Sequence, residues 1–350
     1  MNMTGALIIK HFGWLRHGLR VRLNAGFHFL QLLAIKVRLK ISAPHGRLVF
    51  ITLLESLGDI VACEPIVREI KRRDPRCYVV WGVKAAFMEL VESNPCIERT
   101  IVLHCLSERI LLARKGLFDQ VVDLHFSDRH CSLCRKPLLP ATKTAHAISL
   151  GNYFNFGNIL DTFSQSAGLE VPDLTPRVYI PAASAARVDR LNLRSPYVVI
   201  HCMSNAWEKD WPVTKWRDLH AALSSAGYEI SVVEVGTASI FGDDPPSGLA
   251  SLCGVLSILE SAEVIRRASL FIGIDSGPAH LANAVGTYGV ILLGSYLGFG
   301  RYTPFSGKYA NGENATLIHA DGLVADIAVE DVFRAVAGYL AAGGTACASQ

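Results

Sequence analysis

Side chains able to hold an anion gather where an apolar run ends, in the segment 270–294. The run Leu270–Ile274 leads into a polar turn and then into a helical pattern of small residues, and the residues of interest are Asp275, Ser276, Gly277 and His280. Ligands bind at the carboxyl ends of strands in open α/β sheets, and a helix amino end offers N–H groups to phosphate. The pattern therefore predicts a phosphate site made by Ser276 or by the amides of Gly277 and Ala279. A plain strand–helix connection without a ligand is the alternative.

Two other positions have the chemistry of a transfer reaction. The expected strand Leu48–Leu54 leads through a glycine turn to Asp59, and a carboxylate there could act as a base; helix capping is the alternative, because Asp caps helices readily. The loop after the expected strand Tyr197–His201 carries Lys209. Its ammonium could neutralise a departing diphosphate, whereas the alternative is a solvated surface lysine.

The elements that position these residues alternate between short β-branched runs and helical patterns, which indicates parallel sheets covered by helices. Further strands are expected at 78–81, 100–103, 120–124, 229–235, 290–293 and 316–318. Length and a proline-rich change of texture between 169 and 196 indicate two domains, 46–185 and 186–342, followed by a disordered tail at 343–350. No dinucleotide fingerprint, Walker A motif or Gly-x-Ser-x-Gly elbow is present.

Residues 1–45 form a basic arm in which cationic side chains alternate with aromatic and aliphatic ones. Such a segment is typical of attachment to an anionic membrane surface. Its longest charge-free stretch is too short to span a bilayer, and it lacks a signal-peptide pattern. We expect Gly13, Gly18 and Gly26 to divide the arm into two short helices; packing of an N-terminal helix on the protein's own surface is the alternative. The net charge of +3 is too small to imply a nucleic-acid partner.

The nine cysteines show no regular disulfide framework, which suits a reducing cytosol. Cys131 and Cys134 form a Cys-x-x-Cys motif, with Cys105, His104, His125 and His130 nearby in the sequence. Structural zinc usually takes two such pairs, and no second one exists. The sequence therefore favours a reduced loop, with Cys131 and Cys134 as weak metal candidates.

Three landmarks in order resemble glycosyltransferase family 9, the ADP-heptose:lipopolysaccharide heptosyltransferases. They are the Ser-Leu-Gly-Asp segment ending at Asp59, the loop with Lys209 two residues before Trp211-Pro212, and the Asp-Ser-Gly-x-x-His string that starts at Asp275. Trp211 and Trp216 are expected to be packing residues. One departure is that Thr237 stands where the family commonly has a ribose-binding glutamate after Gly236, and Glu234 is no clear replacement.

The resemblance implies a GT-B fold, with two Rossmann-like αβα domains facing a cleft, and inverting, metal-independent glycosyl transfer without a cofactor. It implies that the N-terminal domain binds a glycan or glycolipid acceptor and that the C-terminal domain binds a nucleotide sugar such as ADP-heptose. The basic arm and the cysteine usage add the expectation that the protein is cytoplasmic and peripheral on the inner face of the membrane. Asp59 and Lys209 would be catalytic, and the donor would be bound by Ser204, Lys209, Asp275, Ser276, Gly277 and His280. A sugar-nucleotide epimerase or hydrolase and a non-catalytic, membrane-tethered scaffold are the alternatives.

Overall fold

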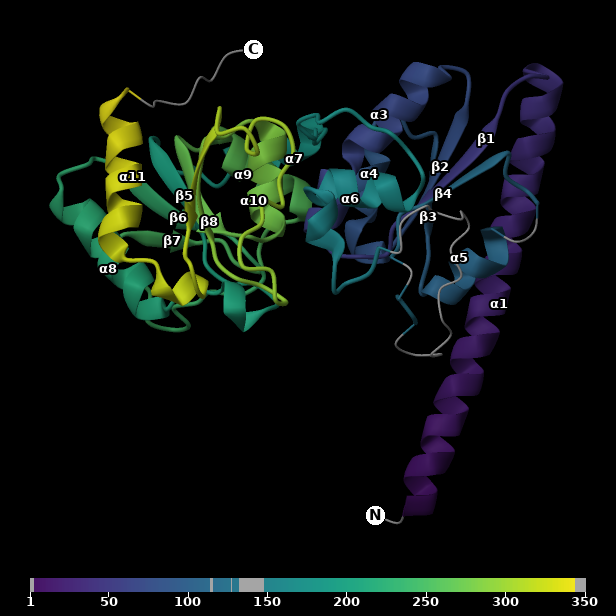
Figure 1. Ribbon diagram of the computed structural model, residues 1–350, viewed down its shortest axis with the longest axis horizontal. Coiled ribbons are helices and arrows are strands. Elements are labelled where there is room, and N and C mark those ends of the chain that lie inside the picture. Colours follow the sequence, from purple (N-terminus) through teal and green to yellow (C-terminus); the bar gives the residue numbers. More distant parts are fainter. Residues whose placement is uncertain (1–2, 114–115, 127, 132–147, 344–350) are drawn as a thin grey trace. The chain divides into compact units, whose positions relative to one another are not determined.

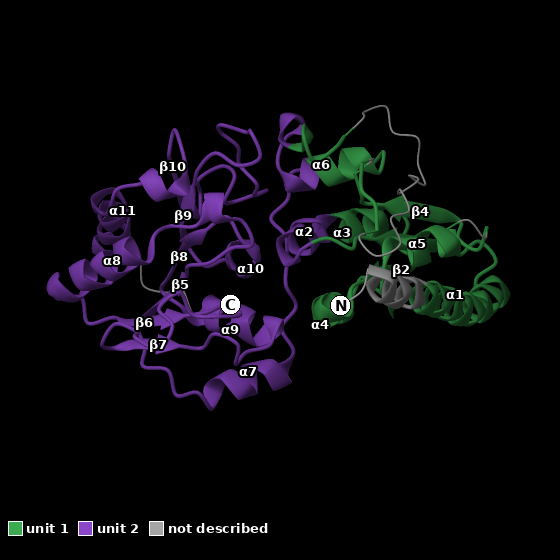
Figure 2. Ribbon diagram, turned by 90° about the horizontal axis from the view of Figure 1, so that it is seen from below, with its two compact units in different colours: residues 1–55, 66–153, 162–171 green, residues 56–65, 154–161, 172–350 purple. Residues whose placement is uncertain are grey.

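The structure, a computed structural model, describes residues 3–113, 116–126, 128–131 and 148–343 of the 350-residue chain. It divides into two compact units, coloured separately in Figure 2. The first comprises residues 1–55, 66–153 and 162–171, and the second comprises residues 56–65, 154–161 and 172–350. The segment 56–65 thus directly follows a strand of the first unit in sequence but groups with the second. The domain limits expected at 45/46 and 185/186 stay predictions.

The first unit contains a parallel sheet in the order β3-β2-β1-β4. Its strands are β1 (Leu48–Thr52), β2 (Tyr78–Val83), β3 (Arg99–Val102) and β4 (Gln120–Asp123). All five residues of β1 are buried, because helices and loops cover both faces of the sheet. The helical segments that begin in or adjoin this part of the chain are α3 (Glu64–Arg73), η1 (Ala85–Phe87), α4 (Met88–Glu92), α5 (Leu106–Ala113), η2 (Tyr153–Phe156) and α6 (Ile159–Ser166).

The second unit contains a parallel sheet in the order β10-β9-β8-β5-β6-β7. Its strands are β5 (Tyr197–His201), β6 (Ser231–Glu234), β7 (Leu249–Ser251), β8 (Leu270–Ile274), β9 (Gly289–Leu293) and β10 (Ala315–His319). The helical segments are α2 (Leu57–Ala62), α7 (Ala182–Asp189), η3 (Trp207–Lys209), α8 (Val213–Ser225), α9 (Ile258–Arg267), α10 (Gly277–Val285), η4 (Val324–Asp326) and α11 (Val329–Ala341). The two parallel sheets confirm the expected α/β class. Trp211 and Trp216 are buried edge to face in the core, as expected of packing residues.

The N-terminal arm is one helix, α1 (Met3–Ser42), which Figure 1 shows as a long rod beside the sheet and α5 of the first unit. The expected division at Gly13, Gly18 and Gly26 is therefore wrong. A glycine inside a helix costs only about 1 kcal/mol relative to alanine, so packing can outweigh it. Val21, Ala25 and Leu32 supply that packing, because all three are buried in the core of the first unit.

Polar contacts also attach α1 to the first unit. The Asn24 side-chain amide donates to the Val102 carbonyl at 3.2 Å and to a carboxylate oxygen of Glu108 at 2.9 Å. Lys36 Nζ donates to the Leu117 carbonyl at 2.6 Å and lies 3.4 Å from Asp119 Oδ1. One face of the arm is therefore part of the folded unit, which is the alternative that the sequence left open. None of the helices in the described part of the chain is long and apolar enough to cross a bilayer.

Candidate functional site

Asp275 lies directly after β8 and is the centre of a buried polar cluster in the second unit. Its side chain is 5% exposed, and its Oδ2 accepts hydrogen bonds from Lys209 Nζ at 2.7 Å and from the Tyr302 hydroxyl at 2.8 Å. Burial opposes ionisation of this carboxyl and would raise its pKa. Electrostatic interactions with Lys209 and His280, together with the hydrogen bonds from Lys209 and Tyr302, outweigh burial and lower the pKa. Asp275 is therefore an ionised carboxylate held by two donors.

Lys209 reaches this carboxylate from η3, in the loop after β5. Its ammonium lies 3.9 Å from the centre of the Tyr296 ring, a cation–π distance, as well as 2.7 Å from Asp275. Burial disfavours the charged form, but Asp275, Tyr296 and Asp59 raise the pKa of Lys209 above its ordinary value. The surface-lysine alternative is wrong for this residue, because its side chain is only 16% exposed.

His280 lies in the first turn of α10 and is 2% exposed. Burial lowers its pKa to about 4, so the ring is neutral near pH 7. Its Nε2 lies 3.9 Å from Asp275 Oδ1, and the ring packs 4.7 Å from Phe305. The buried Nδ1 has no hydrogen-bond partner among the described residues. A neutral imidazole with one unused nitrogen can still bind a ligand group.

Asp59 joins this cluster because α2 packs on α10 within the second unit. Glycines permit the close approach on both sides: a Cβ on Gly58 would lie 2.7 Å from the His280 ring, and a Cβ on Gly277 would lie 2.8 Å from Leu57. Asp59 is also close enough to Lys209 to interact with it electrostatically, since its charge contributes to the raised pKa of Lys209. The structure therefore brings Asp59, Lys209, Asp275 and His280 together.

Asp59 has a structural role as well. Its Oδ2 accepts from the Ser56 backbone N–H at 3.0 Å and from the Ser56 hydroxyl at 2.5 Å, at the start of α2. Ser56 is the N-cap and Asp59 is the third helical residue of a capping box. Both of these hydrogen bonds go to Oδ2 of Asp59, so the structure supports the capping role that the sequence gave as the alternative.

The structure changes two details of the predicted phosphate site. The Ala279 amide is not free, because it donates to the Ser276 carbonyl at 3.1 Å. The space in front of the Gly277 Cα holds Leu57, so a side chain there would first disturb the packing of α2 on α10. The Ser276 hydroxyl donates its one proton to the Ile274 carbonyl at 3.1 Å, so it would have to rotate away from the strand end before it could donate to a phosphate. The amide of Gly277, and the Ser276 hydroxyl after such a rotation, remain the candidates for phosphate contacts.

Ser204 and Glu234 hold the loops around the site through hydrogen bonds. The Ser204 backbone N–H donates to Asp210 Oδ1 at 2.7 Å and its hydroxyl donates to the Ala206 carbonyl at 2.7 Å, so Ser204 braces the loop that carries Lys209. Glu234 is 1% exposed, and its two carboxylate oxygens accept from the Ile240 backbone N–H and the Ser251 hydroxyl. Glu234 therefore holds its own loop, and both of its oxygens are in use.

Three aromatic residues of the site could not be found from the sequence. Tyr302 donates to Asp275 and stacks on Phe154 with ring centres 4.2 Å apart, while Tyr296 faces the Lys209 ammonium. Phe154 is far away in the sequence, and neither tyrosine lies in a motif. Only the folded chain places these rings around the charged pair.

The first unit has a separate charged cluster that follows β1 and β4. Glu55 accepts hydrogen bonds from the Arg129 guanidinium. His125 Nδ1 lies 2.8 Å from Asp123 Oδ1, and the other oxygen of Asp123, Oδ2, pairs with Arg109. Burial lowers the pKa of His125 to about 3, so this ring is neutral. Its Nε2 accepts from the Leu54 backbone N–H at 2.9 Å, which shows that the histidine is used to hold the end of β1.

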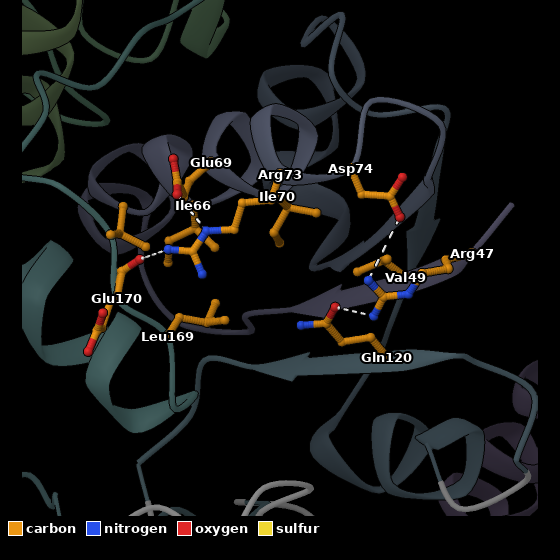
Figure 3. A pocket seen from close by; sticks show the side chains of 11 residues that line it. Arg47, Val49, Ile66, Glu69, Ile70, Arg73, Asp74, Gln120, Leu169 and Glu170 are labelled. Carbon is orange, nitrogen blue, oxygen red and sulfur yellow. Dashed lines mark hydrogen bonds and ion pairs between the residues drawn. The ribbon is translucent and has the colours of Figure 1, made fainter. Parts of the chain in front are cut away.

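A pocket of about 210 Å³ lies at the opposite, amino end of β1 and β4 (Figure 3). Four of its charged side chains are paired: Arg73 with Glu69, and Arg47 with Asp74. Arg73 Nε contacts Glu69 Oε1 at 2.6 Å and its guanidinium also donates to the Glu170 carbonyl, whereas Arg47 contacts Asp74 and Gln120. None of the residues predicted to bind a donor lines this pocket. With these four charges paired, it is a poor candidate for an ionic ligand.

The Cys-x-x-Cys motif is only partly described. Cys131 is buried at 4% exposure, whereas Cys134 lies outside the described residues. His104 contacts Glu108, and His125 belongs to the cluster after β4, so neither of these predicted neighbours joins Cys131 in a group of metal-ligating atoms.

Comparison with known proteins finds the same family that the sequence motifs resemble. Residues 156–296 match the model of glycosyltransferase family 9 (heptosyltransferase), which confirms the resemblance seen in the sequence. Lipopolysaccharide heptosyltransferase 3 of Escherichia coli is 31% identical over 128 residues, covering 33% of this chain and 37% of that protein. The matched segment thus spans about a third of the length of the curated relatives.

Two solved structures cover more of the chain. The glycosyltransferase family 9 protein of Veillonella parvula aligns with a TM-score of 0.65 and 18% identity over 85% of this chain and 97% of that one. The ADP-heptose lps heptosyltransferase II of Escherichia coli aligns with a TM-score of 0.63 and 18% identity over 85% and 99% of the two chains. This similarity confirms the GT-B fold.

Proposed function

We propose that the protein is an inverting glycosyltransferase that transfers heptose from ADP-heptose to a lipopolysaccharide-type glycan. The observation that carries the proposal is the convergence of Asp59, Lys209, Asp275 and His280 in the second unit. Lys209, Asp275 and His280 lie within the segment that matches the heptosyltransferase family. A carboxylate beside a cationic site is the minimum that a single displacement on a nucleotide sugar requires. The relatives' names supply the sugar and the acceptor class.

In the proposed reaction Asp59 accepts the proton of the acceptor hydroxyl as its oxygen attacks the anomeric carbon. The bond from that carbon to the diphosphate breaks, and the configuration inverts. Lys209, the Gly277 amide and the Ser276 hydroxyl stabilise the charge that develops on the departing ADP. We propose that these groups make a catalytic metal unnecessary, and that the first unit binds the acceptor.

The ion pair between Lys209 and Asp275 sets a condition on donor binding. Because the two charges neutralise each other at 2.7 Å, a diphosphate must compete with Asp275 for the ammonium. Tyr302 keeps its hydrogen bond to Asp275 Oδ2 during that exchange, so the carboxylate would not be left without a donor. In the ligand-free protein, Asp275 orients the Lys209 side chain and prevents it from turning into solvent.

ADP is expected to raise the melting temperature of the protein more than AMP or adenosine, since the proposed contacts are mainly to the diphosphate. A ligand that binds only the folded state stabilises it by about 2.7 kcal/mol at a hundredfold excess over its dissociation constant. Differential scanning fluorimetry with each nucleotide measures the shift. Lys308→Ala, which removes an exposed lysine of the same unit, is the control and should keep the full shift.

The outcomes of this titration separate the possible functions. Stabilisation by UDP or GDP but not ADP would retain the glycosyltransferase and reject ADP-heptose, an outcome that the missing ribose-binding glutamate after Gly236 makes informative. Release of free sugar from the donor without any acceptor would favour a hydrolase, and conversion to another nucleotide sugar would favour an epimerase. If no nucleotide binds at millimolar concentration, the scaffold alternative replaces the enzyme.

We further propose that the protein is cytoplasmic and attaches through α1 to the anionic inner face of the membrane. The side of α1 that does not pack on the first unit carries a continuous apolar stripe at spacings of three and four residues, consisting of Leu15, Leu19, Leu23, Phe27, Leu30, Leu33, Val37 and Ile41. All eight are at least 40% exposed, and the same helix carries Arg16, Arg20, Arg22, Arg38 and Lys40. Apolar side chains with flanking cations are the combination that binds an anionic interface.

Changing Leu23, Phe27 and Leu30 to serine together is expected to weaken binding to phosphatidylglycerol vesicles at least about tenfold, since each buried side chain contributes roughly 1.5–3 kcal/mol. Vesicle co-sedimentation measures this, and wild-type binding should weaken as salt is raised. These residues are exposed, so folding is preserved, whereas deletion of the whole arm would remove the buried Val21 and Leu32. Val255→Ser, at an exposed position of the other unit, is the control. Equal binding of the triple variant would reject the stripe as the membrane contact.

A further inference from the structure

Three potential metal ligands from distant parts of the sequence meet in the first unit. They are His17 on α1, Cys105 just before α5, and Cys131 in the loop after β4. One ring nitrogen of His17 and the two sulfur atoms all lie within 4.8 Å of one another. This group lies in the first unit, and the proposed glycosyltransferase chemistry uses none of its members.

The surroundings of the group leave a histidine nitrogen unsatisfied. His17 Nε2 is buried and has no hydrogen-bond partner in the described part of the chain. A buried polar atom without a partner has lost its hydrogen bonds to water, and a bound metal ion would supply the missing partner. The two thiols beside it are 8% and 4% exposed, and neither is in a disulfide.

The thiols of Cys105 and Cys131 are in hydrogen-bond contact with each other. A divalent cation between them would be coordinated by thiolates, because metal binding deprotonates a coordinating thiol.

We propose that His17, Cys105 and Cys131 bind a Zn²⁺ ion. Two thiolates and an imidazole are a donor set that zinc takes in tetrahedral sites, with Zn–S distances near 2.3 Å and Zn–N distances near 2.0–2.1 Å. These bond lengths place tetrahedral ligand atoms about 3.5–3.8 Å apart, so closure around an ion requires inward movements of about an ångström or less. Water or another small ligand completes the fourth position.

The site joins α1 to the body of the first unit. Cys105 and Cys131 belong to the same apolar cluster as Val21, Ala25 and Leu32 of α1, and His17 lies one turn before Val21. Zinc would therefore attach to the first unit the part of α1 around His17, which precedes Val21 in the sequence. The sequence favoured a metal-free loop because Cys131 and Cys134 formed a single pair. Cys105 was already a candidate neighbour of that pair, and the fold adds His17, which no spacing rule connects to Cys131.

Metal analysis of the full-length protein tests the proposal. Protein produced with zinc supplied and dialysed under reducing conditions should contain about one zinc per chain by plasma mass spectrometry. Cys131→Ser and His17→Ala should each lower the zinc content at least fivefold, whereas the matched controls Cys253→Ser and His45→Ala should retain it. Less than about 0.2 zinc per chain in the wild type, or the same content in all variants, would overturn the proposal.

A second measurement covers the case in which a cysteine variant folds poorly. Cobalt added to the metal-free wild type should produce a thiolate-to-cobalt charge-transfer band that His17→Ala reduces and His45→Ala leaves intact. Removal of zinc by a chelator should speed proteolytic cleavage within α1 several-fold, with no change in the His17→Ala protein. A wild type that shows neither the cobalt band nor protection by zinc, or in which Cys105 and Cys131 form a disulfide under the reducing conditions used, does not contain this site.

Discussion

Replacing Asp59 by asparagine is expected to lower the rate of sugar transfer by about 10²-fold or more while donor binding is nearly unchanged. The reason is that an amide cannot accept the proton of the acceptor hydroxyl, and loss of a general base has consequences of this size. Asparagine keeps a side-chain oxygen for the Ser56 N–H, so the start of α2 should remain capped. Single-turnover transfer from the nucleotide sugar, measured beside the ADP melting shift, tests both statements.

Ser56→Ala is the matched control for the structural role of Asp59. It removes the 2.5 Å hydrogen bond from the hydroxyl and part of the capping box, but it leaves the carboxylate in place. Its stability should fall by about 1 kcal/mol, with less than a tenfold change in transfer rate. If the two variants lose stability and activity in the same proportion, Asp59 acts only as part of the cap and the catalytic assignment fails.

Lys209→Ala is expected to destabilise the ligand-free protein by about 3–5 kcal/mol, because it leaves the Asp275 carboxylate buried without its cation. From the sequence alone, with Lys209 as a loop residue, we would expect a nearly unchanged melting temperature; the ion pair in the structure reverses that expectation. The variant should also lose most of its stabilisation by ADP. Equilibrium urea unfolding and melting curves measure both effects.

The carboxylate of Asp275, the other charge of the ion pair, provides the control for this result. Asp275→Asn in the Lys209→Ala background removes the uncompensated carboxylate and should recover part of the lost stability, whereas it should not restore the response to ADP. Lys308→Ala, at an exposed lysine, should change stability by less than about 0.5 kcal/mol. A Lys209→Ala protein as stable as the wild type would mean that the pair with Asp275 does not form in solution.

The local sequence predicted the elements that carry the chemistry. Strands of a parallel sheet covered on both faces are mostly apolar runs, so they could be located from hydrophobicity. The strand Leu270–Ile274 has the expected bounds, whereas the strand expected at Leu48–Leu54 ends two residues earlier, at Thr52. The turn after each strand is encoded by adjacent residues, and Asp59 and Asp275 could therefore be selected as site residues. Trp211 and Trp216 were also expected to be packing residues, and both are buried in the core.

Contacts between distant segments were decided only by the tertiary structure. The sequence identified Lys209 and Asp275 separately, but their 2.7 Å ion pair and the hydrogen bond from Tyr302 depend on how three loops meet at one sheet end. The approach of α2 to α10 depends on shape, since Gly58 and Gly277 are informative only when the side chains opposite them are known.

The N-terminal helix shows the same limit of local information. Its glycines favour interruption, but the burial of Val21, Ala25 and Leu32 against the first unit outweighs that local preference. His17, Cys105 and Cys131 likewise become a group only after α1 packs beside α5. Local sequence determines strand ends and turns because backbone preference and burial act over a few residues, whereas these long-range pairings depend on the packing of whole elements.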